Sequence, residues 1–215
     1  MKTLLLTLLL STSAFASQIT LSPANEVFQN TTLSVALSDG TTTLPLAAYG
    51  LGLKKIGLTY YKVAVNQFYV ENPANLVRTF DGIYASLNNV GKMAFRLTFL
   101  RGVGSDLIQS SIQDAITANM TDAEATTYQS DIQKVSNALL NGPALSFGSS
   151  ISFVAYPATN QVLFEDASGA DTLMQFTGSN FVFKIFAIWF GNQTTKEGAI
   201  LKTALLTVPQ VTPAR

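Results

Sequence analysis

The spacing of apolar residues in the first half of the chain predicts β-strands. Thr32 to Leu37 alternates between polar and apolar residues and Asp39-Gly40 follows as a turn, so residues 18–44 are expected to form a hairpin or an edge element. Residues 58–71 are largely apolar at odd and even positions alike. This pattern predicts a long strand that is buried on both faces, and it ends at Asn72-Pro73 because proline has no N–H to give to a sheet.

Two later segments also follow the two-residue period of a strand. Residues 93–99 place four large apolar side chains on one face, namely Met93, Phe95, Leu97 and Phe99. Residues 149–166 contain two short apolar runs separated by the turn sequence 156–160, which predicts a hairpin.

Between and after these strands the period changes to that of a helix. Isoleucines recur every four residues from Ile108 to Ile116, and Ser105 is placed to cap the helix that carries them. The capping box Thr121–Glu124 begins a second helix, which runs to Gly142 and buries one apolar stripe. Both helices have a polar face, and Asp114 and Asp131 are expected to lie in solvent there.

The last third of the chain predicts two more helices. Residues 181–190 contain a single charged residue, so a helix here is apolar nearly all round and must be buried, although it is too short to cross a membrane. A second capping box at Thr194–Glu197 begins a final helix that ends near Leu206. With no internal repeat or linker in the sequence, residues 17–215 are expected to form one α+β domain.

Composition excludes several classes of function. The chain has 215 residues, 13 basic and 13 acidic side chains, and neither His nor Cys. Nucleic-acid binding is not expected, because it needs a basic face to neutralise phosphates. Zinc fingers, cysteine clusters and His-dependent nucleophiles are excluded, so any catalysis must use Asp, Glu, Lys, Arg, Tyr, Ser or Thr. We expect no metal or other cofactor.

Residues 1–16 have the pattern of a cleaved signal peptide. Lys2 gives a positive start, residues 4–10 form a short apolar stretch, and Ala14-Phe15-Ala16 fits the small-residue cleavage rule. The apolar stretch is too short for a stable membrane span. The mature protein is therefore expected to be periplasmic or secreted, and to be stabilised by core packing without disulfides.

A few residues near the middle of the chain are candidates for a site. Gly50-Leu51-Gly52 has the start of a dinucleotide-binding loop but lacks the third glycine, which favours close packing or a strand bend over a phosphate site. Lys54 and Lys55 are either solvated residues of a strand edge or, if one points inward, a cation that needs an anion. Tyr60 and Tyr61 are expected as amphipathic wall residues, one hydroxyl of which could face a cavity.

These segments together resemble the chalcone isomerase-like family. Residues 50–55 followed by 61–70 are similar to the opening strand of that family. Residues 95–103 resemble its strand that ends in an arginine, and residues 186–191 with 194–206 resemble its closing pair of helices. The resemblance extends over about residues 45–206 in the family's order. It implies an open-faced β-sandwich, in which a long antiparallel sheet is covered by helices and a ligand lies between the two.

The polar residues that serve isomerase catalysis in the plant members are not retained. The resemblance places Ala64 where the family has a threonine, and Leu107 and Asp114 where it has tyrosine and asparagine. Ile188 takes the place of the late-helix serine or threonine, and only Lys54 or Lys55 stands near the arginine site. Because loss of one aimed donor typically costs about 10²-fold in rate, the sequence argues against isomerase activity.

The resemblance also extends to non-catalytic members that are similar to fatty-acid-binding proteins. It implies a cleft in which a lysine meets an acid head group and aromatic residues hold the apolar chain. The residues expected to bind the ligand are Lys54, Lys55, Tyr60, Tyr61, Phe95, Phe99, Phe186 and Trp189, with Phe68 and Phe183 as further possible walls.

Three functions remain open on the sequence alone. The first is an exported protein that binds a fatty acid or similar hydrophobic acid. The second is an intramolecular lyase or isomerase that uses Lys54, Lys55, Tyr60 or Tyr61. The third is a structural or interaction protein whose aromatic rings simply fill the core, with a strand edge or the helix face of Asp122 to Lys134 as its contact surface.

Overall fold

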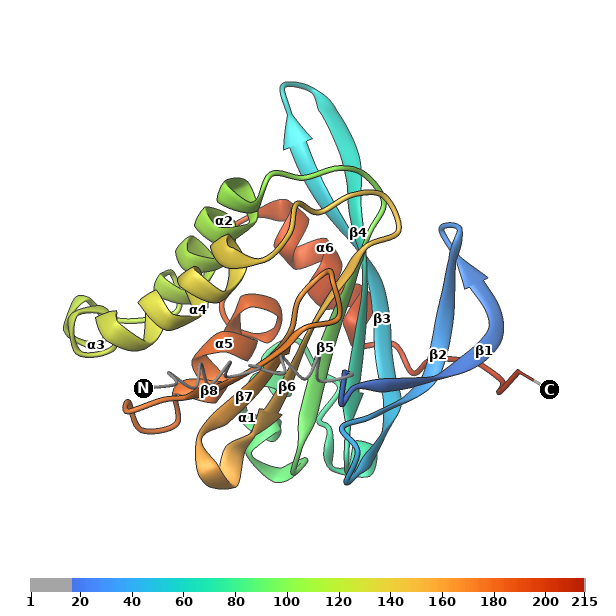
Figure 1. Ribbon diagram of the computed structural model, residues 1–215, viewed down its shortest axis with the longest axis horizontal. Coiled ribbons are helices and arrows are strands. Elements are labelled where there is room, and N and C mark those ends of the chain that lie inside the picture. Colours follow the sequence, from blue (N-terminus) through green and yellow to red (C-terminus); the bar gives the residue numbers. More distant parts are fainter. Residues whose placement is uncertain (1–16, 215) are drawn as a thin grey trace, which may run out of the picture.

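The computed structural model describes residues 17–214, and its centre is one antiparallel sheet whose eight strands follow one another in chain order (Figure 1). The predicted signal peptide lies outside the described residues. The strands are β1 (Thr20–Phe28), β2 (Thr31–Ser38), β3 (Thr43–Ile56), β4 (Thr59–Val70), β5 (Met93–Phe99), β6 (Ser150–Tyr156), β7 (Gln161–Glu165) and β8 (Asp171–Gln175).

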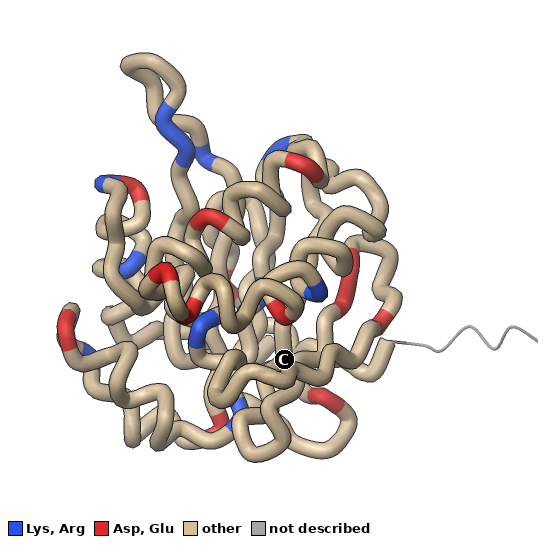
Figure 2. Tube along the Cα trace, turned by 90° about the vertical axis from the view of Figure 1, so that its left-hand side faces the viewer, with Lys and Arg blue, Asp and Glu red and all other residues tan. Residues whose placement is uncertain are grey.

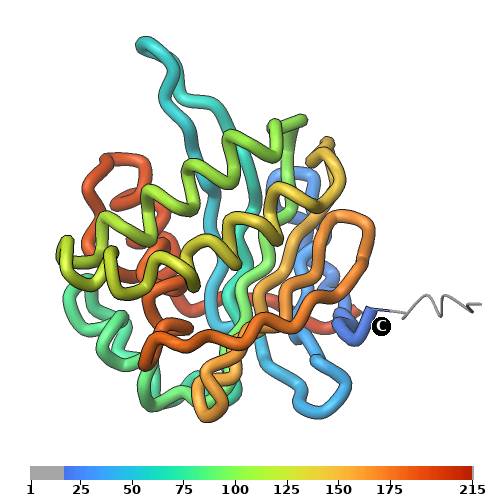
Figure 3. The backbone as a smooth tube through the Cα atoms, turned by 60° about the vertical axis from the view of Figure 1, so that its left-hand side comes forward, coloured from blue at the N-terminus to red at the C-terminus, as the bar shows by residue number. Residues whose placement is uncertain are grey.

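Helices cover one face of this sheet (Figure 3). They are α1 (Ile83–Ser86), α2 (Ser105–Thr117), α3 (Asp122–Thr127), α4 (Gln129–Asn141), α5 (Phe181–Phe190) and α6 (Lys196–Leu205). Helix α5 packs its apolar side into the main core, α2 lies against α4 and α5, and α6 packs on β3. The α+β class and the open-faced sandwich that the resemblance implied are therefore confirmed.

The central strands are buried on both faces, as the apolar pattern of residues 58–71 predicted. On the helix side, Phe68 of β4 belongs to the main core. On the other side, Tyr69 packs in a second cluster with Leu37 and Leu44, because the β1–β2 hairpin folds over that face. The neighbouring side chains of one strand thus belong to two different cores, which requires the strand to be apolar throughout.

The hairpin expected within residues 18–44 is confirmed, with its turn at Gln29 and Asn30, and the turn predicted at Asp39-Gly40 is confirmed as the connection from β2 to β3. Another predicted element differs from the structure. The backbone at Tyr128 leaves the helical conformation (φ −96°, ψ 9°), which divides the predicted helix after Thr121 into α3 and α4. Strand β8 and helix α1 were not predicted, since each is short and lacks a clear period.

Two of the predicted helix caps are also displaced by one residue. Gly104 is the N-cap of α2, and its first helical residue is Ser105, which makes no capping bond. Thr195 caps α6 by accepting a hydrogen bond from the Gly198 N–H, so Thr194 lies outside that cap. The capping box at Thr121 is confirmed, with Glu124 donating its backbone N–H to the threonine and accepting from the Thr121 N–H.

Asp131 is not in solvent. Its carboxylate is buried on α4 and accepts hydrogen bonds from the backbone N–H groups of Thr177 (3.1 Å) and Gly178 (2.7 Å) and from Lys134 Nζ (2.9 Å). Burial alone would raise the pKa of Asp131, but the hydrogen bonds from Lys134, Gly178 and Thr177 outweigh it and lower the pKa. This carboxylate therefore ties α4 to the loop that leads into α5.

Candidate functional site

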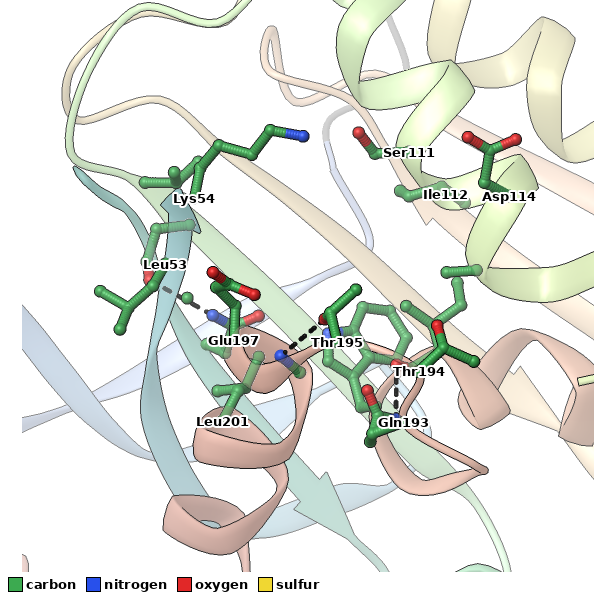
Figure 4. Close-up of a pocket in the computed structure, with 18 of the residues that line it drawn as sticks. Leu53, Lys54, Ser111, Ile112, Asp114, Gln193, Thr194, Thr195, Glu197 and Leu201 are labelled. Atoms are coloured by element: carbon green, nitrogen blue, oxygen red, sulfur yellow. Dashed lines mark hydrogen bonds between the residues drawn. The ribbon is translucent and has the colours of Figure 1, made fainter. Parts of the chain in front are cut away.

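A cavity of about 780 Å³ lies between the sheet and the helices, at one end of the main core (Figure 4). Strands β3, β4 and β5 form one wall, α2 forms the opposite wall, and α5, α6 and the loop between them close the base. Its volume lies within the range of small-molecule sites in proteins, about 300–1,000 Å³.

The periods seen in the sequence explain the apolar walls. Alternation along β4 and β5 turns Ala64, Leu97 and Phe99 to the helix side of the sheet. The four-residue spacing on α2 turns Ile108 and Ile112 back toward them. Trp189 of α5 lies at the base, where its ring also stacks on Phe95 with centroids 3.8 Å apart.

Small residues keep this space open and bring the surrounding elements close together. A Cβ on Gly50 would lie 3.0 Å from both Ala204 Cβ and Leu201 Cδ1, so this glycine allows α6 to pack directly on β3. A Cβ on Gly52 would lie 2.9 Å from Asn66 Nδ2. The Gly50-Leu51-Gly52 segment lies within strand β3 and serves close packing, as expected, and does not form a phosphate-binding loop.

Charged side chains from three elements line the opening. Lys54 and Lys55 come from β3, Asp114 from α2 and Glu197 from α6. Figure 4 shows the Lys54 side chain extending across the cavity toward the α2 wall, where Ser111 and Asp114 lie. None of the four charges forms an ion pair with another residue of the described chain. The two lysines are therefore available to an anionic ligand.

The loop between α5 and α6 is held in place by two hydrogen bonds, of which the one from Lys202 is buried. Lys202 of α6 is buried and donates from Nζ to the Gly191 carbonyl (2.9 Å), and its ammonium lies 4.1 Å from the centroid of the Phe80 ring. Burial lowers the pKa of Lys202. The Asn192 N–H donates to Asn119 Oδ1 on the helix-α2 side at 2.6 Å. The base of the cavity is thus fixed by α6 and by the segment that follows α2.

The structure brings together four of the eight residues expected to bind a ligand. Lys54, Lys55, Phe99 and Trp189 line the cavity. Phe95 and Phe186 do not line it, because they are fully buried among the rings of the main core. Of the two further walls, Phe68 is buried in the same cluster and Phe183 packs at its edge.

Tyr60 and Tyr61 also lie outside the cavity. They belong to the part of the β3–β4 hairpin that projects from the body, where both are partly exposed. Lys55 Nζ lies 5.8 Å from the centroid of the Tyr60 ring, and the Arg101 guanidinium lies 4.9 Å from that of Tyr61. Strand β4 has the expected extent, but its first residues run beyond the helices that cover the sheet and carry these tyrosines away from the cavity.

Three of the four positions carried over from the family resemblance do line the cavity, namely Ala64, Asp114 and Ile188. Leu107 does not, since it lies exposed on the outer side of α2. Sequence reasoning missed Asn66, Ser111 and Glu197, which also line the cavity. Asn66 had a usable signal, because it lies two residues from Ala64 and so on the same face of β4.

An antiparallel sheet covered on one face by helices, with a cavity between the two layers, defines the open-faced β-sandwich class. Residues 27–207 match the model of the chalcone isomerase-like family, and the chain belongs to this family. None of the curated proteins compared with the chain matches it.

The crystal structure of a fatty-acid binding protein from Arabidopsis thaliana is similar to this chain. The TM-score is 0.61 and the sequence identity is 14%, and the alignment covers 86% of this chain and 98% of the plant protein. At this identity the likeness shows the shared fold. Among residues 17–214, no helix is long and apolar enough to cross a membrane, and no three acidic residues gather closely enough to hold a metal ion.

Proposed function

We propose that this protein binds a fatty acid or a similar hydrophobic acid in the cavity and does not catalyse a reaction on it. The observation that carries the proposal is a mainly apolar cavity lined by two lysines that have no ion-pair partner among the described residues. The acid group lies at Lys54 and Lys55, and the hydrocarbon chain lies along Phe99, Ile112 and Trp189.

The two carboxylates of the cavity orient such a ligand. Asp114 lies on the α2 wall and Glu197 lies on α6. Each carboxylate repels an acid group, so the acid group is placed at the β3 lysines and not against the α2 or α6 wall. The fatty-acid binding protein from Arabidopsis thaliana, which has the same fold, supports this class of ligand.

The absence of catalysis is part of the proposal and rests on the same cavity. Ala64 and Ile188 line it without any hydrogen-bond donor in their side chains. Stabilising charge that develops on a reacting oxygen requires donors aimed at that oxygen. A cavity with apolar groups at these positions holds a ligand without activating it.

Export is the third part of the proposal, and the pattern of residues 1–16 supports it. Expression of the full chain in a Gram-negative host, followed by fractionation and mass determination, tests it. We expect a periplasmic or secreted product that begins at Ser17. A product that retains Met1 in the cytoplasm would contradict this part and leave the ligand proposal intact.

Trp189 is a built-in reporter for the ligand test, because it is the only tryptophan of the chain and it lines the cavity. Titration with dodecanoate is expected to change its emission at saturating concentration. Dodecanol, which has the same chain but no acid group, is expected to bind at least about tenfold more weakly, since a charge-assisted hydrogen bond is lost.

Matched variants locate the acid group. Lys54→Gln is expected to reduce dodecanoate affinity about tenfold and to leave dodecanol affinity unchanged. Lys196→Gln is the control, because Lys196 is exposed on the same surface but does not line the cavity. Unchanged Trp189 emission with both compounds would refute the proposal, and equal affinity for both would refute the role of the lysines.

A second candidate function is an intramolecular lyase or isomerase. The observation in its favour is that Lys54 extends toward Ser111 and Asp114, so a cation, a hydroxyl and a carboxylate face one space. Such groups are suited to acid–base work. Turnover of a hydroxychalcone that disappears in the Lys54→Met, Lys55→Met double variant would establish this activity. No turnover across a panel of unsaturated ketones would exclude it in favour of binding.

A further inference from the structure

The β3–β4 hairpin extends well beyond the rest of the sheet. On its β5 side, the last backbone hydrogen bond of β4 runs from the Leu100 N–H to the Val63 carbonyl (2.8 Å). Beyond it, residues 53–62 continue as a ribbon of β3 and β4 alone. From Val63 to Leu58 it spans about 16 Å at about 3.3 Å per residue. Figures 1 and 3 show this ribbon projecting from the body of the molecule.

The tip of the ribbon is apolar and exposed. Leu58 is 96% exposed and Ile56 is 61% exposed, on either side of the turn at Gly57. A two-stranded ribbon has no core of its own and is marginally stable in water. Two large aliphatic side chains at its end therefore add nothing to the fold, and they leave apolar surface in water.

Below the tip, the side chains are aromatic and basic. Cross-strand pairing places Lys55 opposite Tyr60 and Lys54 opposite Tyr61. Lys62 follows on β4 and donates from Nζ to Gln29 Oε1 of the β1–β2 turn (2.7 Å), and Arg101 lies over the Tyr61 ring. Residues 50–65 contain no acidic residue, and Figure 2 shows basic positions on the hairpin without acidic ones. The chain as a whole has equal numbers of acidic and basic residues, so this concentration of positive charge is local.

The geometry points to a docking hairpin for an anionic lipid surface, in which Leu58 and Ile56 enter the membrane interface. Tyrosine and lysine prefer the interface itself, where the tyrosine ring is partly buried and the lysine reaches toward lipid phosphates. Local positive charge attracts anionic lipids within about a Debye length. The order of apolar tip, tyrosines and cations matches the order of layers that a bilayer presents.

The shape of the hairpin favours a lipid surface over a protein partner. A stable protein interface covers about 800 Å² on each partner. A narrow ribbon with two apolar residues at its end offers far less, whereas shallow insertion into a bilayer needs only a small apolar tip. The inference does not depend on the proposed ligand, since the tip residues Ile56 and Leu58 do not line the cavity. Lys54 and Lys55 belong to the hairpin and also line the cavity, which places the cavity beside the docked surface.

The test uses the absence of cysteine from the chain, which makes Leu58→Cys a unique labelling position. An environment-sensitive fluorophore there is expected to shift to the blue with phosphatidylcholine vesicles that contain phosphatidylglycerol, and to be quenched by a quencher attached to the lipid. Pure phosphatidylcholine is expected to give little response. Leu173→Cys on β8 is the control, because Leu173 is exposed on an edge strand of the sheet, four strands away from β4.

A second measurement follows the sedimentation of the unlabelled chain with the same anionic vesicles. Leu58→Asp is expected to weaken binding at least about tenfold, and Lys62→Gln about fivefold, which is the effect of one lysine near an anionic surface. Leu173→Asp is expected to have no effect. All variants keep residues 1–16, so any vesicle binding by these residues is the same in every variant and cancels in the comparison. A label at position 58 that remains in water with both kinds of vesicle overturns the inference, as does an equal response to both.

Discussion

Two neighbouring regions on the helix side of the sheet differ in one respect, which is whether the space between the layers is filled. Beneath α5, the rings of Phe68, Phe95, Phe186 and Phe190 pack together with no exposed surface. Beneath α2 and α6, the cavity of about 780 Å³ remains open. Trp189 belongs to both regions, since it stacks on Phe95 and lines the cavity.

The difference follows from side-chain volume along a single strand. Three successive residues of β4 that face the helices lead from the filled region to the cavity, namely Phe68, Asn66 and Ala64. The side chain becomes smaller at each step. The same alternation of side chains between the two faces of the sheet therefore gives a packed core at one end of the strand and a cavity at the other.

The largest expected effect is on the filled region. Phe95→Ala is expected to lower the free energy of unfolding by about 3–5 kcal/mol, because it leaves a void among rings that cannot move together. Urea unfolding measures this. Ile108→Ala in the cavity wall is the matched variant, and it is expected to cost about 1 kcal/mol because Ile108 is only half-buried. Equal losses in both variants would show that the two regions do not differ in packing.

The next effect concerns the anchor that presents α5 to the core. Asp131→Asn is expected to lower the free energy of unfolding by about 3 kcal/mol near neutral pH, because the amide cannot accept all the bonds from Lys134, Thr177 and Gly178. A carboxyl with a lowered pKa stabilises the fold above its unfolded pKa of about 3.9. The unsubstituted protein is therefore expected to lose its extra stability over Asp131→Asn as the pH falls from about 3.9 through the lower pKa of Asp131 in the folded state.

Asp114→Asn is the control for this measurement. Asp114 is exposed at the cavity and forms no ion pair within the described residues. Its replacement is expected to change stability by less than about 0.5 kcal/mol. A difference between parent and Asp131→Asn that is constant down to about pH 3 would contradict the role of the ionised carboxylate.

The smallest expected effect on stability comes from enlarging a side chain, in the filled region and in the cavity wall. Ala155→Leu on β6 is expected to cost about 1–3 kcal/mol, because Ala155 is fully buried in the main core. Ala115→Leu on α2 is expected to change stability by less than about 0.5 kcal/mol, since the added atoms enter the cavity. The same variant is expected to weaken dodecanoate binding at least about tenfold. Equal destabilisation by both substitutions would show that the cavity is not open in solution.

Much of the fold could be predicted from the residues alone, because periods of two and about four residues mark buried strand and helix faces. Strands β4 and β5 and helices α2 and α5 follow these periods clearly. The break at Tyr128 and strand β8 could not be predicted. The first depends on how α4 meets the loop after Phe176, and the second is paired only at the sheet edge.

The candidate site was predictable only in part. Lys54 and Trp189 were found through the family resemblance, and both line the cavity. Phe95 and Phe186 carry the same chemical signal as Phe99, yet they fill the core. The burial of Asp131 was missed for a similar reason, because its backbone partners at Thr177 and Gly178 lie more than forty residues away in the sequence.

The sequence by itself determined the kinds of element, the face that each one buries and the family to which the chain belongs, since these follow from local spacing and from motifs. Only the tertiary structure decided which aromatic rings fill the core, which residues line a cavity and which hairpin stands clear of the body. These properties depend on where distant segments meet, and the same residue type is buried, lining or exposed according to the volume of its neighbours.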